Sequence, residues 1–254
     1  MFLSIICQKG GVGKTTLSVN ISHIFAKKGK KTLLIDLDPQ GNSTTYLSNN
    51  KDKKALSSLD LLSTRDPIDP ENIPEVRENL YLIQSNQEIK RLISEKLPAG
   101  STLFRRKRNN EFEQFDQIII DTPPAMNSVI HEGISISDYY LIPTRAEYLS
   151  VEGVGQAIEY VKSVVLNNRN INPIFLGVVL NSVDKRRSSF KSFHSELRLI
   201  LGDKLFETSI SQLAEIADAP FYGLTASEHN PNGKAYEELV LLVEEIQRRV
   251  IEYK

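Results

Sequence analysis

The sequence predicts an α/β fold in which helices cover both faces of a mostly parallel, twisted β-sheet. Short apolar runs rich in Val, Ile and Leu alternate along the chain with longer stretches of helical periodicity. Strands separated by helices form βαβ units, which give a parallel sheet buried on both faces. A glycine-rich turn joins the first apolar run directly to the first helical stretch. The carboxyl ends of the strands are therefore the expected place for a functional site.

Six apolar runs and four helical stretches make up this pattern. The predicted strands are residues 3–7, 32–36, 80–84, 117–121, 139–143 and 174–180. The predicted helices are residues 14–28, 150–166, 189–201 and 235–253. No internal repeat and no long low-complexity linker interrupts the pattern, so residues 1–254 are predicted to form a single domain.

Composition narrows the functional class. The 254 residues include 31 Lys and Arg against 32 Asp and Glu, and this balance argues against a histone-like polycation or an acidic tail. Cys7 is the single cysteine, which excludes an internal disulfide and a cysteine-based zinc or iron–sulfur site within one chain. The chain shows neither a secretory leader nor an apolar run long enough to span a membrane, so a cytoplasmic protein is expected.

The strongest motif is the segment QKGGVGKTT, which runs from Gln8 to Thr16 between a predicted strand and a predicted helix. Glycines let successive backbone N–H groups surround phosphate oxygens, and the start of the helix adds a favourable dipole. This spacing places Lys14 against the β- and γ-phosphates of a nucleotide and the Thr15 hydroxyl against Mg²⁺. The predicted nucleotide-binding residues here are Lys9, Gly10, Gly11, Val12, Gly13, Lys14, Thr15 and Thr16. The fold is therefore predicted to be of the P-loop NTPase type.

Three aspartates follow predicted strands. Asp36 and Asp38 end the second apolar run, and strand alternation places both on one side of the chain until Pro39. Asp121 ends the run IIID, a Walker B arrangement that sets a rigid carboxylate near Mg²⁺. Acids that face a triphosphate would repel it unless they hold the metal or orient water, so these three are predicted to do one or the other.

These motifs resemble the ParA/MinD group of P-loop ATPases, and the ParA/Soj family in particular. Gln8 stands where the standard P-loop has glycine, and Lys9 adds an early second lysine, as in the deviant Walker A motif of that group. The segments DLDPQGN after residue 35 and DTPP from Asp121 also match, and the similarity runs from about residue 3 to 253. The resemblance implies a slow, Mg²⁺-dependent ATP hydrolase that a partner protein stimulates.

The resemblance also implies roles for individual residues. Lys9 would reach across a dimer interface to the partner's nucleotide, so that ATP binding drives homodimer formation. Lys14 would act on the phosphates and Asp38 on the attacking water, which makes Lys9, Lys14 and Asp38 the predicted catalytic residues. Thr15, Asp36 and Asp121 would serve the metal, with Asp36 supporting its water shell.

The same resemblance implies nucleotide contacts at two further positions and one segment. Glu147 would contact the nucleotide across the dimer, and Asn181 would meet the adenine edge, which an amide can both donate to and accept from. Residues 210–213 match the stretch that closes over the base, although the proline, arginine and asparagine usual in the family are absent. The arginines that the family uses on DNA align with Gln212 and Glu215.

Two basic clusters remain as candidate DNA-binding residues. The cluster after the sixth predicted strand consists of Lys185, Arg186, Arg187, Lys191 and Arg198, and a second lies at 105–108. Such clusters can track phosphates, with an affinity that falls steeply with salt. The resemblance implies sequence-independent binding of duplex DNA by the ATP dimer on the nucleoid, and a ParB-like or other cargo-adaptor partner. The cargo could be a plasmid or chromosome locus, or a protein organelle such as the carboxysome.

A MinD-like membrane-bound regulator is the alternative. The final segment, residues 240–254, has apolar periodicity, but acids interrupt its polar face. A packed last helix is therefore favoured over a membrane anchor, and no membrane partner is expected.

Overall fold

A seven-stranded sheet forms the centre of the protein. The computed structural model describes residues 1–48, 55–64, 66–94, 102–124, 127–146, 150–168 and 170–253. The strands are β1 (Phe2–Ile5), β2 (Thr32–Asp36), β3 (Glu75–Arg77), β4 (Leu80–Ile83), β5 (Gln117–Asp121), β6 (Tyr139–Thr144) and β7 (Ile174–Leu180). Their order across the sheet is β3-β4-β2-β5-β1-β6-β7, and every neighbouring pair is parallel except β3 with β4. The predicted mostly parallel α/β sheet is confirmed.

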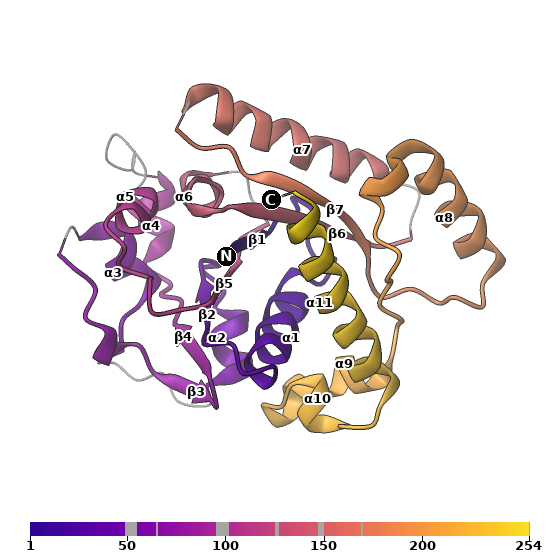
Figure 1. The fold of residues 1–254 in the computed structure, drawn as a ribbon, viewed down its shortest axis with the longest axis horizontal. Helices are drawn as coiled ribbons and strands as arrows, with labels where there is room; N and C mark the ends of the chain where they lie inside the picture. Colours follow the sequence, from indigo (N-terminus) through magenta and orange to yellow (C-terminus); the bar gives the residue numbers. More distant parts are fainter. Residues whose placement is uncertain are drawn as a thin grey trace.

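Helices cover both faces of the sheet (Figure 1). The longer helices are α1 (Lys14–Lys27), α6 (Ser128–Ile136), α7 (Ser150–Asn167), α8 (Ser188–Leu201) and α11 (Lys234–Glu252). The shorter ones are α2 (Asn42–Leu47), α3 (Ser58–Ser63), α4 (Ile89–Ser94), α5 (Thr102–Arg108), α9 (Ala214–Asp218) and α10 (Ala226–His229), with 3₁₀ turns η1 (Pro70–Asn72), η2 (Gly202–Lys204) and η3 (Ala219–Tyr222).

Alternation along the strands divides the apolar core between the two faces of the sheet. Leu34 of β2 and Ile119 of β5 pack in one cluster with α1 and α11. Their neighbours Leu33 and Ile118 face the other way, into a cluster with α3, α5 and α6. A third cluster joins β6 and β7 to α6, α7 and α8. Period-2 alternation thus supplies an apolar surface to both faces of the sheet.

The predicted elements match the observed ones, with small shifts at their ends. The first strand, expected at 3–7, ends at Ile5, so Cys7 already belongs to the loop that follows, where it is buried. The edge strand β3 was not predicted, because it has only three residues and two of them, Glu75 and Arg77, are charged. No helix in the described part of the chain is long and apolar enough to cross a membrane.

The basic segment at 105–108 forms the end of α5, and one of its side chains is part of the core. Arg106 is 1% exposed and pairs with Glu111 at 2.6 Å. Its other guanidinium hydrogens reach the carbonyl oxygens of Leu61, Thr64 and Asp66, at 2.8–3.0 Å. This side chain therefore ties α5 to the end of α3 rather than offering charge to a ligand.

Replacing Arg106 should destabilise the fold strongly. Arg106→Met leaves the Glu111 carboxylate buried without its cation and three carbonyl groups without a donor, so the free energy of unfolding should fall by about 3–5 kcal/mol. Arg108→Met, at an exposed position two residues later, is the matched control and should change it by less than about 0.5 kcal/mol. Urea denaturation of both variants measures the difference; equal midpoints would contradict a structural role for Arg106.

Candidate nucleotide-binding site

The glycine-rich loop connects β1 to α1, as the sequence predicts. Lys14 is the first residue of α1, and Gly13 before it has a φ of 90°, in the left-handed region that favours glycine. A Cβ at Gly13 would lie 2.0 Å from Nδ2 of Asn181, which donates a 2.7 Å hydrogen bond to the Val12 carbonyl oxygen. Glycine is thus required at position 13 for two reasons, and Asn181 holds the loop from the end of β7.

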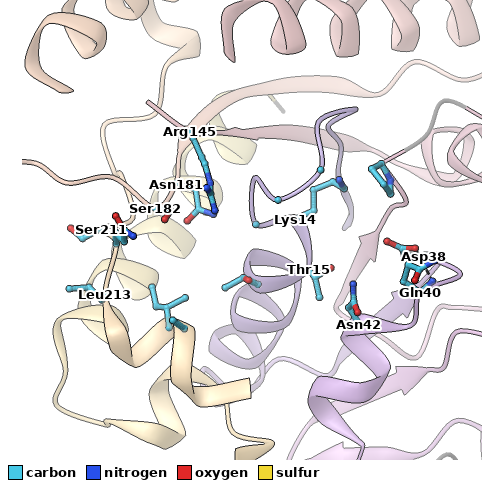
Figure 2. Close-up of a pocket in the computed structure, with 18 residues that line it drawn as sticks. Lys14, Thr15, Asp38, Gln40, Asn42, Arg145, Asn181, Ser182, Ser211 and Leu213 are labelled. Carbon is cyan, nitrogen blue, oxygen red and sulfur yellow. Dashed lines mark hydrogen bonds between the residues drawn. The ribbon is translucent and has the colours of Figure 1, made fainter. Parts of the chain in front are cut away.

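A cavity of about 540 Å³ opens in front of this loop. Figure 2 shows Lys14 and Asp38 at one end of it and Asn181, Ser182 and Ser211 at the other. The predicted residues that line it are Gly10, Gly11, Gly13, Lys14, Thr15, Thr16, Asp38 and Asn181. Residues from four regions far apart in the chain therefore meet at the carboxyl edge of the sheet.

Asp36 and Asp121 lie behind the cavity as neighbours on adjacent strands. They are register partners of β2 and β5, and both are fully buried. Burial, followed by the charge of Asp121, raises the pKa of Asp36 to about 8. Hydrogen bonds from Thr44 and from the Asp38 N–H act in the opposite direction and lower it. The pKa of Asp121 is also raised, because the effect of burial exceeds the lowering by the Ser43 and Thr15 hydroxyls and by the charge of Lys14. A cation beside this pair would favour the ionised form of both carboxyl groups.

The oxygen atoms gathered here suit Mg²⁺. The Ser43 hydroxyl donates to Oδ2 of Asp121 at 2.7 Å, and the Thr15 hydroxyl also bonds this carboxylate. No group of three or more His, Cys, Asp or Glu side chains forms a metal cage among the described residues. Mg²⁺ is usually held by one or two carboxylates together with substrate phosphates, and Asp121 with the Thr15 hydroxyl would supply the protein's share of these oxygens.

Lys14 and Asp38 lie at the end of the cavity where the sequence predicts the phosphates. Lys14 is 7% exposed, and burial lowers the pKa of its ammonium while the nearby acids Asp121 and Asp38 raise it. Asp38 is also 7% exposed, lines the cavity, and accepts a 2.9 Å hydrogen bond from the Gln40 N–H. An ammonium and a carboxylate in one small cavity give the charge and the acceptor that phosphoryl transfer to water needs.

Several lining residues were not predicted as contacts. Gln40 and Asn42 follow Asp38 directly and could have been found from the strand-end pattern, because loops at this edge of a parallel sheet face the site. Arg145 and Ser182 follow the ends of β6 and β7, so the same signal applies to them. Residues 211–213 line the end of the cavity away from Lys14; their closure over a base stays a prediction. Glu147 lies outside the described residues.

The candidate DNA-binding cluster divides into two kinds of residue. Arg186 and Arg187 project outward with 91% and 74% exposed side chains, each beside Asp184, and Lys191 on α8 is exposed as well. Lys185 instead donates to Glu238 and to the Ser209 carbonyl oxygen. Arg198 donates to two carbonyl oxygens at the end of α8 and beyond it. Their role on DNA stays a prediction, and Arg186, Arg187 and Lys191 are its most accessible members.

Glu215, which the resemblance aligns with a family arginine, has a role inside the fold. Its carboxylate accepts hydrogen bonds from the Ala235 N–H at the start of α11 and from the Asn230 side chain. A carboxylate at a helix N-terminus satisfies an otherwise unpaired donor and interacts favourably with the dipole. In this fold Glu215 therefore caps the start of α11.

Known proteins resemble this chain over nearly its whole length. A family model described as an AAA domain matches residues 1–173. The sporulation initiation inhibitor protein Soj of Bacillus subtilis is 32% identical over 247 residues, which cover 96% of this chain and 97% of Soj. The chain belongs to the ParA/Soj family. The chromosome-partitioning ATPase Soj of Thermus thermophilus is 28% identical, over 98% of this chain and 96% of its own.

Solved structures share the fold of this family member. A plasmid partition protein from Borrelia burgdorferi bound to AMPPNP has a TM-score of 0.80 at 23% identity, over 99% of this chain and 98% of that one. McdA from Cyanothece also has a TM-score of 0.80, at 24% identity, over 96% and 98%. At these identities the likeness concerns the arrangement of sheet and helices alone.

Proposed function

We propose that this protein is a Mg²⁺-dependent ATPase that dimerises around ATP and binds duplex DNA without sequence preference. In this proposal hydrolysis, stimulated by a ParB-like or other adaptor, releases the DNA and so positions a plasmid or chromosome locus on the nucleoid. One observation carries the proposal: Lys14 of the P-loop and Asp38 line one cavity, and the buried carboxyl groups of Asp36 and Asp121 lie directly behind it. The names of the Soj relatives, chromosome-partitioning proteins among them, support the cargo class.

In this proposal, different residues along the cavity bind the phosphates, the attacking water, the metal ion and the base. The loop N–H groups and Lys14 bind the phosphates, and the carboxylate of Asp38 holds water in line with the terminal phosphorus. Thr15 and Asp121 would hold Mg²⁺, with Asp36 behind them, and the ion would neutralise charge on the β- and γ-phosphates. Asn181 and residues 211–213 would receive the base at the other end. Residues 1–254 act as one domain in this proposal.

DNA binding is tested by charge removal at the exposed arginines. We expect ATP-loaded protein to bind duplex DNA with an affinity that falls as salt rises. Arg186→Ala/Arg187→Ala should weaken it and make the dependence of log K on log[salt] shallower by about one unit for each arginine–phosphate interaction removed. Lys162→Ala/Arg248→Ala is the matched control, because these side chains are also exposed and paired with acids. Co-sedimentation with anionic liposomes instead of DNA would replace this function with the membrane alternative.

Lys9 should separate dimerisation from nucleotide binding. It lies in the loop but does not line the cavity of its own chain, which agrees with a role toward a partner's nucleotide. Lys9→Ala should bind ATP with nearly unchanged affinity, yet stay monomeric and lose hydrolysis. Light scattering with ATP gives the mass, and Lys30→Ala, exposed after α1, is the control. Normal ATP-dependent dimers of the variant would make Lys9 an ordinary loop residue.

A further inference from the structure

A closed ring of hydrogen bonds surrounds the backbone that carries Asp38. The Asp38 N–H donates to Oδ1 of Asp36 at 3.1 Å, and the Thr44 hydroxyl donates to Oδ2 of Asp36 at 2.8 Å. The Ser85 N–H donates to the Thr44 hydroxyl at 2.8 Å, and the Ser85 hydroxyl donates to the Asp38 carbonyl oxygen at 2.5 Å. The four residues thus form a continuous circuit in which each is bonded to the next.

Ser85 is the member that joins the ring to a different part of the sheet. Asp36, Asp38 and Thr44 belong to one segment, β2 and the start of α2, whereas Ser85 follows β4. Strands β2 and β4 are parallel neighbours with Ile35 opposite Ile83, so their carboxyl ends, and the loops after them, lie together. Ser85 can therefore bond to a segment more than 40 residues earlier, because the sheet topology places the ends of β2 and β4 side by side.

The backbone at Ser85 is anchored independently of the phosphate loop. The carbonyl oxygen of the preceding Gln84 accepts hydrogen bonds from the Ser58 N–H at 2.8 Å and from its hydroxyl at 3.2 Å, at the start of α3. Ser85 is 5% exposed and is not among the residues that line the cavity. It is a fixed point against which the loop carrying Asp38 is placed.

We propose that Ser85 is a positioning residue for hydrolysis, which sets the Asp38 carboxylate against the attacking water through the Asp38 carbonyl group. This inference rests on the proposed function. The loop from 37 to 41 has a second tie at the same carbonyl, from the Gly41 N–H at 2.8 Å, but that bond lies within the loop and cannot fix it to the sheet. Among the described residues, the Ser85 hydroxyl is the group that holds this carbonyl from outside, and a shift of about 1 Å in a reacting group can cost about 100-fold in rate.

The test compares turnover with ATP affinity in a set of matched variants. Ser85→Ala should lower single-turnover hydrolysis about three- to tenfold, the range set by one net hydrogen bond, while the dissociation constant for ATP changes less than about twofold. Thr44→Val, which keeps the side-chain shape and breaks the ring elsewhere, should give the same split. Because the ring acts as a unit, the double variant should be no slower than the slower single variant.

Two further variants separate positioning from stability. Ser85→Thr retains the hydroxyl and should recover most of the turnover. Ser137→Ala removes a similarly buried hydroxyl, on a residue that is 6% exposed, which donates to the Gly133 carbonyl oxygen at 2.7 Å. Ser137 lies just before β6, at the amino-terminal end of the strand and away from the cavity. This variant should leave turnover unchanged.

The possible results distinguish failure of the role of Ser85 from failure of the proposed function. Wild-type turnover in both Ser85→Ala and Thr44→Val, while Asp38→Ala is inactive, would overturn the role of Ser85 and leave the proposed function standing. Full turnover in Asp38→Ala would remove the proposed function itself. Equal losses in ATP affinity and turnover would reduce Ser85 to a structural residue. If Ser85→Ala does not fold, Thr44→Val and Ser85→Thr decide the question.

Discussion

Lys14→Ala should abolish measurable ATP binding. Lys14 lines the cavity beside the glycines of the loop and is almost fully buried. No other described lysine lines this cavity, so none can take its place. A charge-assisted contact of this kind contributes about 3 kcal/mol, and its loss should raise the dissociation constant by about 100-fold or more. Titration calorimetry or a fluorescent ATP analogue measures the change.

The fold should survive this substitution. Burial lowers the pKa of Lys14, which means that the ammonium is held there at a desolvation cost. Replacing it with Ala removes that cost, so the melting temperature without nucleotide should stay within a few degrees, about the spread of a neutral substitution. Lys27→Ala, at the other end of α1, is the control for both measurements. ATP affinity close to wild type in Lys14→Ala would contradict the assignment of the loop.

The parts of the site that are contiguous in sequence were predictable. The loop from Lys9 to Thr16 is predicted to act through backbone N–H groups and two side chains of one segment, so its spacing alone indicates its chemistry. The meeting of Asp36 with Asp121 could also be foreseen, because both end buried strands and the ends of parallel strands meet at one edge. These inferences need only the order of the elements.

Contacts that depend on the exact path of the chain were not predictable. The Asn181 amide reaches the Val12 carbonyl from 169 residues away, and it fits only because Gly13 has no Cβ. Ser85 carries no local motif, yet it fixes the loop of Asp38. The basic clusters show the same limit, since Arg106 belongs to a charged run typical of a surface and is buried in the fold.

Asp38→Ala should bind ATP and Mg²⁺ but lose turnover. Among the described residues, the Gln40 N–H is the donor to the Asp38 carboxylate, whereas the Asp38 backbone groups make the bonds to Asp36 and Ser85. Alanine keeps those backbone bonds, so the loop should keep its conformation and only the acceptor for water should be lost. A positioned base or acceptor is worth about 100- to 10,000-fold in rate, and single-turnover hydrolysis should fall by at least the lower figure.

Because ATP is bound but not consumed, the same variant should accumulate as an ATP-loaded dimer. Light scattering should then give twice the protomer mass with ATP, and a longer-lived complex with DNA than wild type forms. Asp203→Ala, at an exposed position in η2, should hydrolyse ATP normally and serves as the control. Rapid hydrolysis by Asp38→Ala would rule this carboxylate out as the group that orients water. Loss of ATP affinity would instead place Asp38 among the groups that bind the nucleotide, since a missing water acceptor leaves ground-state binding intact.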